Sequence, residues 1–107
     1  MADVTALDAT NFESFMHQPG AVKVLRFWAT WCRPCIALEP TYNEVAGELK
    51  GQANFGEVDI DQAPEIANAF GIRSVPTVLV FKDGQPVDAI VGLYPKHHYT
   101  IAVTKAA

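Results

Sequence analysis

A stretch of apolar residues that ends in two closely spaced cysteines constrains this chain more than any other feature. Residues 22–29 are mostly apolar, as expected for a strand covered on both faces of a sheet. The sequence Cys32-Arg33-Pro34-Cys35 follows shortly after and contains the only cysteines. Pro34 suits the first turn of a helix, because its missing N–H is not needed there. The stretch therefore predicts a buried strand that leads through a cysteine pair into a helix.

The two cysteines are separated by two residues, a spacing at which their sulfurs can close a disulfide. A thiolate, rather than a thiol, attacks a disulfide. Free amide groups and the dipole at the start of the helix favour the anion of Cys32. Cys35 lies one turn further into the helix, so we expect it to be more buried and its thiol to have the higher pKa. This inequality predicts a thiol–disulfide exchange site in which Cys32 attacks and Cys35 resolves the mixed disulfide.

A zinc site is the competing interpretation of two cysteines at this spacing. Zinc takes four ligands, and the cysteines supply only two. His97 and His98 are adjacent, which does not match the spacing of a zinc finger's histidine pair, and His17 lies far away in the sequence. The sequence therefore predicts no metal site.

The composition argues against some classes of partner and indicates a cellular compartment. The 107 residues carry a net charge of −4 without a basic cluster, which argues against binding to nucleic acid. No apolar run approaches the length of about 18 residues that a membrane span needs. The first residues lack the basic and apolar segments of a signal peptide, and a lone cysteine pair fits the cytoplasm. A signal peptide removed beforehand is the open alternative.

Strand and helix patterns alternate along the chain. The strands are predicted at residues 4–7, 22–29, 55–60, 77–81 and 87–91. The helices are predicted at about residues 12–16, with Thr10 and Glu13 as a capping box, at 34–49, at 64–70, with Asp61 as the cap, and at 95–105. Asp83-Gly84 predicts a hairpin turn between the last two strands.

This order of elements predicts one α/β domain over residues 1–107. Parallel strands come first and a hairpin comes last, so right-handed crossovers place helices on both faces of a mixed sheet. The predicted fold has three layers, α/β/α, with a central mixed five-stranded sheet flanked by four helices. The cysteines fall at the carboxyl end of a central strand, where open α/β sheets place their sites.

Several short motifs, in order and at characteristic spacing, match one known family. They are Phe27-Trp28-Ala29, Trp31-Cys32, Pro34-Cys35, Pro40, Asp59-Ile60-Asp61, Phe70-Gly71-Ile72-Arg73, Val75-Pro76-Thr77, Phe81-Lys82-Asp83-Gly84 and Val91-Gly92. Each motif is weak alone, and together they are highly specific. The sequence resembles the thioredoxin family over essentially its whole length.

The resemblance implies a function and a set of roles. Such proteins reduce the disulfides of client proteins, hold no cofactor, and are reduced again by a thioredoxin reductase that draws on NADPH; we expect a monomer. The resemblance also implies a cis peptide bond before Pro76, which turns the Val75 backbone outward so that an extended client segment can pair with it. The implied apolar docking surface consists of Trp31, Pro34, Val75, Pro76, Val91, Gly92 and Leu93.

One departure from the family pattern is Arg33, which stands where glycine is usual. A cation about 6 Å from a thiolate contributes about 0.7 to 3 kcal/mol before screening by salt. We therefore expect Arg33 to lower the pKa of the Cys32 thiol, to stabilise the reduced protein and to make the disulfide more oxidising. A solvated arginine without effect is the alternative.

A second departure concerns two positions on neighbouring strands. The family usually has a buried aspartate, which relays the proton of the second cysteine, near a lysine, whereas this sequence has Arg26 and Glu57. A covered arginine needs a partner, and Glu57 is the natural one. Arginine stays protonated and cannot act as a base. Glu57 is therefore a candidate acceptor for the Cys35 proton, directly or through water, and solvent is the alternative.

Three functions stay open on the sequence alone. A general protein-disulfide reductase is favoured by the cysteine pair together with the cis-proline motif. Arg33 makes a more oxidising exchange protein, or a dedicated electron donor, the second candidate. The third is a binding module that uses the groove near Pro76, with the cysteines incidental.

Overall fold

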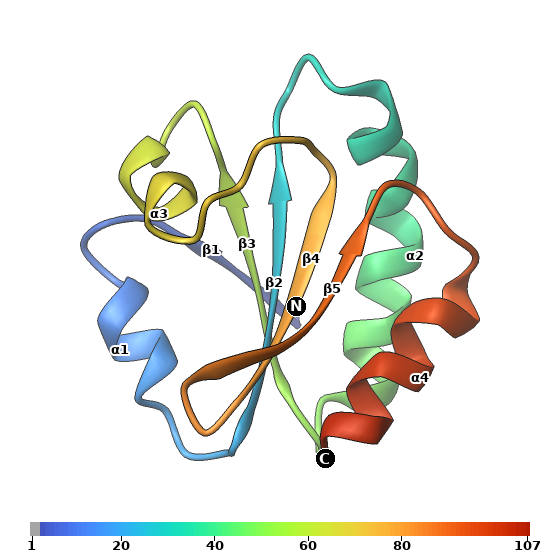
Figure 1. Ribbon diagram of the computed structural model, residues 1–107. Coiled ribbons are helices and arrows are strands. Elements are labelled where there is room, and N and C mark those ends of the chain that lie inside the picture. Colours follow the sequence, from blue (N-terminus) through green and yellow to red (C-terminus); the bar gives the residue numbers. More distant parts are fainter. Residues whose placement is uncertain (1–2) are drawn as a thin grey trace.

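A central sheet of five strands organises the computed structural model, which describes residues 3–107 (Figure 1). The elements are, in order, β1 (Val4–Leu7), α1 (Phe12–Met16), β2 (Val22–Trp28), α2 (Arg33–Leu49), β3 (Asn54–Asp59), α3 (Pro64–Ala69), β4 (Thr77–Lys82), β5 (Gln85–Val91) and α4 (Lys96–Ala106). Every predicted strand and helix is present in this part of the chain, with ends that differ by a residue or two.

The sheet is mixed, and β2 lies at its centre. The strand order is β1-β3-β2-β4-β5. β1, β3 and β2 run parallel, whereas β4 is antiparallel to β2 and pairs with β5 in a hairpin. Figure 1 shows α1 and α3 on one side of the sheet and α2 and α4 on the other. The predicted three-layer α/β/α architecture is confirmed.

Two apolar clusters, one on each face of the sheet, hold the layers together. One cluster joins the sheet to α2 and α4, and the other joins it to α1 and α3. β2 contributes alternately to both, with Val22 and Val24 in the first and Leu25 and Phe27 in the second. If β2 shifted by one residue against its neighbours, each of its side chains would point to the opposite face of the sheet. The two clusters therefore fix the register of β2 and the place where the strand ends. No helix within residues 3–107 is long and apolar enough to cross a membrane.

The predicted capping box at the start of α1 is wrong. Asn11 precedes the helix, and no side chain caps it. Instead, the Asp8 carboxylate accepts a hydrogen bond from the backbone N–H of Thr10 at 2.8 Å and another from the Thr10 hydroxyl. The hydroxyl is therefore used within the preceding turn, because Asp8 offers a charged acceptor two residues away.

The predicted cap of α3 is also wrong. This helix begins at Pro64 after Ala63, and no side chain caps it. The Asp61 carboxylate instead accepts a hydrogen bond from the indole N–H of Trp31 at 2.8 Å. The hairpin turn is confirmed, since Asp83 has φ 52° and Gly84 has φ 82°. Two successive positive φ angles match the twist of an antiparallel hairpin.

Candidate active site

The cysteine pair lies at the junction between β2 and α2. Cys32 is the N-cap of α2 and has an extended backbone, with φ −96° and ψ 104°. Its sulfur accepts a hydrogen bond from the backbone N–H of Cys35 at 3.2 Å. The two cysteines form a disulfide with their Cα atoms 5.2 Å apart. The partial positive charge of the helix start is thus directed at the Cys32 sulfur, where it favours an anion.

The two sulfurs differ in their surroundings. Cys35 is completely buried, whereas Cys32 keeps 5% of its surface exposed. Both pack against Ala29, with Ile60 and Val75 at the edge of the cluster. The Cys32 sulfur lies 3.6 Å from the carbonyl oxygen of Val75. Cys32 is therefore the sulfur that an outside molecule reaches first.

The loop before β4 brings Pro76 beside the cysteines. The Val75–Pro76 peptide bond is cis, as the resemblance implied. β4 then begins at Thr77, which pairs with Val91 of β5. The backbone N–H of Gly92 donates to the carbonyl oxygen of Pro76 at 2.9 Å. Two segments far apart in the sequence, around residues 75 and 92, thus lie side by side.

Exposed apolar side chains lie on the segments next to Cys32 and Pro76. Trp31 is 65% exposed, Val91 54% and Leu93 50%. A pocket of about 300 Å³ lies between Trp31 and Val75, with Ile60 in its wall. Trp31 is held over this pocket by its bond to Asp61. Of the docking residues that the resemblance implies, Trp31 and Val75 line this one pocket. The Gly92–Pro76 hydrogen bond brings the segment around Gly92 to Pro76, which is itself buried.

Sequence reasoning missed two members of this exposed set. Ile36, in the first turn of α2, is 44% exposed, and Tyr94, after Leu93, is 43% exposed. An apolar residue on the outer side of a helix that otherwise packs inward would have been a usable signal for Ile36. Tyr94 directly continues the predicted segment 91–93.

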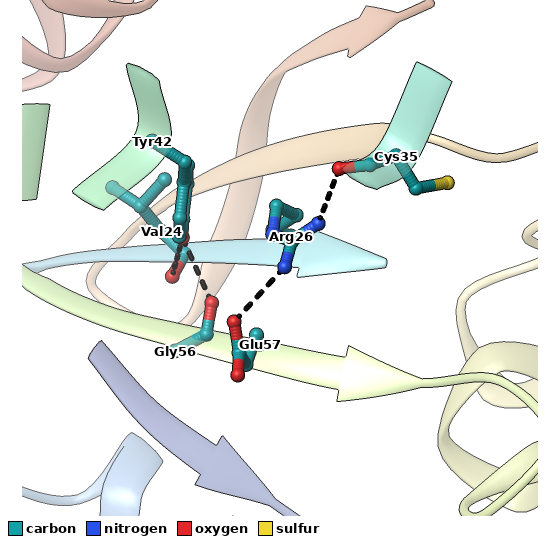
Figure 2. Close-up of polar contacts among 6 residues, drawn as sticks. All are labelled: Val24, Arg26, Cys35, Tyr42, Gly56 and Glu57. Carbon is teal, nitrogen blue, oxygen red and sulfur yellow. Dashed lines mark hydrogen bonds and ion pairs between the residues drawn. The ribbon is translucent and has the colours of Figure 1, made fainter. Parts of the chain in front are cut away.

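A buried cation lies on the inner side of the cysteine pair. Arg26 of β2 is only 1% exposed. Figure 2 shows its guanidinium between Glu57 and Cys35. It donates to the Cys35 carbonyl oxygen at 3.0 Å and to a Glu57 carboxylate oxygen at 3.2 Å. The guanidinium also lies over the Trp28 ring, 5.1 Å from its centroid. This cation is therefore fixed on several sides.

The predicted Arg26–Glu57 ion pair is present. The parallel register of β2 and β3 places the two residues opposite each other. The Glu57 side chain is 22% exposed and lines a pocket of about 320 Å³ together with Asp59. Arg26 occupies the space between Glu57 and the Cys35 backbone (Figure 2), so a route for a proton from Cys35 to Glu57 would need water beside the guanidinium.

A buried tyrosine packs against the same cation. The Tyr42 ring centroid lies 5.8 Å from the Arg26 guanidinium. The Tyr42 hydroxyl lies 2.8 Å from the Gly56 carbonyl oxygen and 3.1 Å from that of Val24 (Figure 2). Burial raises the pKa of Tyr42 well above its ordinary value. Tyr42 therefore stays a neutral hydrogen-bond donor under the sheet.

The two residues between the cysteines lie at the surface. Arg33 is the first residue of α2 and is exposed, and Pro34 follows it and is exposed too. The charge of Arg33 is thus next to Cys32 in the chain but surrounded by solvent. Among residues 3–107, no group of three or more His, Cys, Asp or Glu side chains is arranged to hold a metal ion.

Known proteins match this chain over nearly its whole length. The sequence profile of the family described as Thioredoxin matches residues 3–105. The thioredoxins of Staphylococcus saprophyticus and Staphylococcus haemolyticus are each 41% identical over 105 residues, which cover 98% of this chain and 98% of theirs.

Solved structures agree with the sequence matches. A thioredoxin from Malassezia sympodialis superposes with a TM-score of 0.85 at 31% identity, covering 99% of this chain and 92% of that one. A mutant thioredoxin from Halobacterium salinarum gives a TM-score of 0.88 at 28% identity, covering 98% and 92%. The fold and the cysteine pair therefore have one shared explanation: the chain belongs to the thioredoxin family, as a thiol–disulfide oxidoreductase that reduces protein disulfides through a CxxC pair and without a bound cofactor.

Proposed function

We propose that Cys32 is the attacking thiol and Cys35 the resolving thiol of this reductase. The observation that carries the assignment is the hydrogen bond from the Cys35 backbone N–H to the Cys32 sulfur at the start of α2. A helix start stabilises an anion, so it favours the Cys32 thiolate. Cys35 has no exposed surface, which keeps it away from clients until Cys32 has reacted.

The reaction proceeds in two exchanges. The Cys32 thiolate attacks one sulfur of a client disulfide, a mixed disulfide forms, and the other client sulfur leaves as a thiolate that takes up a proton. Cys35 then loses its proton and attacks the Cys32 sulfur. The second client sulfur leaves, and the Cys32–Cys35 disulfide closes. Two electrons have passed from the dithiol to the client.

Clients dock on the apolar surface around the disulfide in this proposal. The proposed docking surface comprises Trp31, Pro34, Val75, Pro76, Val91, Gly92 and Leu93, and we add Ile36 and Tyr94, because both are apolar and exposed. The Cys32 sulfur is 3.6 Å from the Val75 carbonyl, so a client strand that pairs with the Val75 backbone would bring its disulfide to Cys32. Exposed apolar area at this place supports docking of proteins rather than small polar molecules.

We propose that a thioredoxin reductase that uses NADPH is the electron donor. We also propose that the protein acts in the cytoplasm. Membership of the family supports the partner, because its relatives over 98% of the chain are thioredoxins. A lone cysteine pair that must be kept reduced suits a reducing compartment.

A pair of cysteine variants tests the assignment. With insulin as client and a thioredoxin reductase as donor, we expect Cys32→Ser and Cys35→Ser each to lower turnover by at least about 1,000-fold. Only Cys35→Ser should accumulate a mixed disulfide with the client, detected as a mass adduct on Cys32. An adduct on Cys35 in the Cys32→Ser protein would reverse the roles. A double serine variant that reduced no insulin but kept the full function of the protein would favour a binding module.

A more oxidising exchange protein is the second candidate, favoured by the position of Arg33. This residue opens α2 directly after Cys32, so its cation adds to the helix start in stabilising a thiolate. The reduction potential of the protein separates the two candidates.

A further inference from the structure

A buried tyrosine of α4 holds the loop that joins β5 to α4. Tyr99 is only 2% exposed. Its hydroxyl donates to the Gly92 carbonyl oxygen at 3.2 Å and accepts a hydrogen bond from the Tyr94 backbone N–H at 3.2 Å. One phenol oxygen thus bridges the two ends of the segment 92–94. Burial raises the pKa of Tyr99, so the hydroxyl keeps the proton that it donates.

The same segment is tied to the active site from its other side. The Gly92 N–H donates to the Pro76 carbonyl oxygen at 2.9 Å. Gly92 has φ 107°, a conformation that favours glycine, and the Tyr94 ring lies 3.5 Å from where a Cβ of Gly92 would be. The loop is therefore fixed between Pro76, beside the disulfide, and Tyr99, in the core.

The residues that this loop presents are half exposed and apolar. Leu93 and Tyr94 are 50% and 43% exposed, and Val91, which ends β5 just before the loop, is 54% exposed. Side chains on a mobile loop lose conformational freedom when a partner binds, and a loop fixed beforehand avoids this loss. One hydrogen bond donated and one accepted by a buried phenol are a means of fixing it.

We propose that Tyr99 is a positioning residue for client docking, which holds Leu93 and Tyr94 in the conformation that a client protein meets. The inference rests on the proposed docking surface. Tyr99 takes no part in the chemistry, because its hydroxyl contacts only the backbone of the loop. Its removal should weaken client binding while the reactivity of Cys32 is kept.

The test is Tyr99→Phe, which removes the hydroxyl and keeps the ring in the core. The reduced protein is mixed with an excess of a protein disulfide, insulin, and tryptophan fluorescence follows the exchange. We expect the half-saturating insulin concentration to rise about three- to tenfold, the worth of one or two neutral hydrogen bonds, while the limiting rate stays within about twofold. The rate with a small aromatic disulfide, which needs no docking loop, should be unchanged.

Tyr42→Phe is the matched control. It removes a second buried phenol that also bonds backbone carbonyls, those of Val24 and Gly56, but lies away from the loop. We expect a comparable loss of stability in urea denaturation and no change in half-saturation. If both variants weaken insulin binding equally, general destabilisation explains the effect and the inference is wrong.

Leu93→Ser separates this inference from the docking surface on which it rests. If Leu93→Ser raises the half-saturating concentration and Tyr99→Phe does not, the docking surface stands and the role of Tyr99 is refuted. If Leu93→Ser has no effect either, the docking surface itself is wrong and the inference falls with it. A Tyr99→Phe protein that reacts equally slowly with insulin and the small disulfide would also refute a docking role.

Discussion

The outer side of the cysteine pair is apolar and exposed, whereas the inner side holds a buried charge. Outside, the Cys32 sulfur adjoins exposed apolar side chains, among them Trp31 at 65% exposure. Inside, Cys35 has no exposure, and a buried cation, Arg26, donates to its carbonyl oxygen. An apolar rim suits transient contact with many proteins, whereas a buried charge is tolerated only where partners hold it. In our proposal the outer side docks clients, whereas the inner side holds a buried charge against the backbone of the second cysteine.

The inner side should respond most strongly to mutation. Arg26→Leu removes the bond to the Cys35 carbonyl and leaves Glu57 without its partner. We expect the free energy of unfolding to fall by about 2 to 4 kcal/mol, because breaking a largely buried ion pair strands the remaining charge. Urea denaturation of the oxidised protein measures it.

The double variant Arg26→Leu, Glu57→Leu is the control for this loss. It removes both charges, so it should recover part of the stability that Arg26→Leu loses. A loss below about 0.5 kcal/mol in Arg26→Leu would show that the inner side does not depend on the cation, and the contrast between the two sides would fail.

On the outer side, we expect the charge of Arg33, next to Cys32, to change the reduction potential of the disulfide. Arg33→Gly removes an exposed cation at the start of α2, so the thiolate of the reduced protein should lose stability. Equilibration with glutathione should show a wild-type protein that is more oxidising than Arg33→Gly, by up to about tenfold in the equilibrium constant, or about 30 mV. Arg33→Lys keeps the charge and should keep the wild-type potential. A wild type that is equally or more reducing than Arg33→Gly ends the hypothesis.

We expect the smallest effect from Glu57→Gln, which tests whether Glu57 accepts the Cys35 proton. Glu57→Gln keeps the shape of the side chain and removes its ability to accept a proton near neutral pH. If Glu57 accepts the Cys35 proton through water, the pH profile of the resolving step should shift in this variant. Asp59→Asn, a second carboxylate in the wall of the same pocket, is the matched control and should keep the wild-type profile. An unchanged profile in Glu57→Gln would leave Glu57 only as the partner of Arg26.

Much of this molecule could be predicted from its sequence because its strands carry clear patterns. Apolar residues on both faces of β2 identified it as the central strand, and the strand register then places Arg26 opposite Glu57 as expected. The hairpin turn at Asp83-Gly84 is a local signal that needs no tertiary information. The cis bond at Pro76 came from family resemblance rather than from composition.

The errors and omissions have a common physical cause. The local sequence predicts Asp61 as a helix cap, but its partner is Trp31, 30 residues away in the sequence. It also predicts Thr10 as a cap, although Asp8 competes for the Thr10 hydroxyl. The contacts of Tyr99 are with backbone groups, which leave no trace in residue identities. Sequence patterns report periodic burial well, and they report the partners of single polar side chains poorly.

The inequality of the two sulfurs is most directly tested by alkylating the reduced protein. Iodoacetamide is added at pH 7 for a series of times, and mass spectrometry of the digested protein gives the rate at each cysteine. We predict that Cys32 reacts at least about tenfold faster than Cys35, because its thiolate is stabilised at the start of α2 and Cys35 is buried. Equal rates, or a faster reaction at Cys35, would contradict the account.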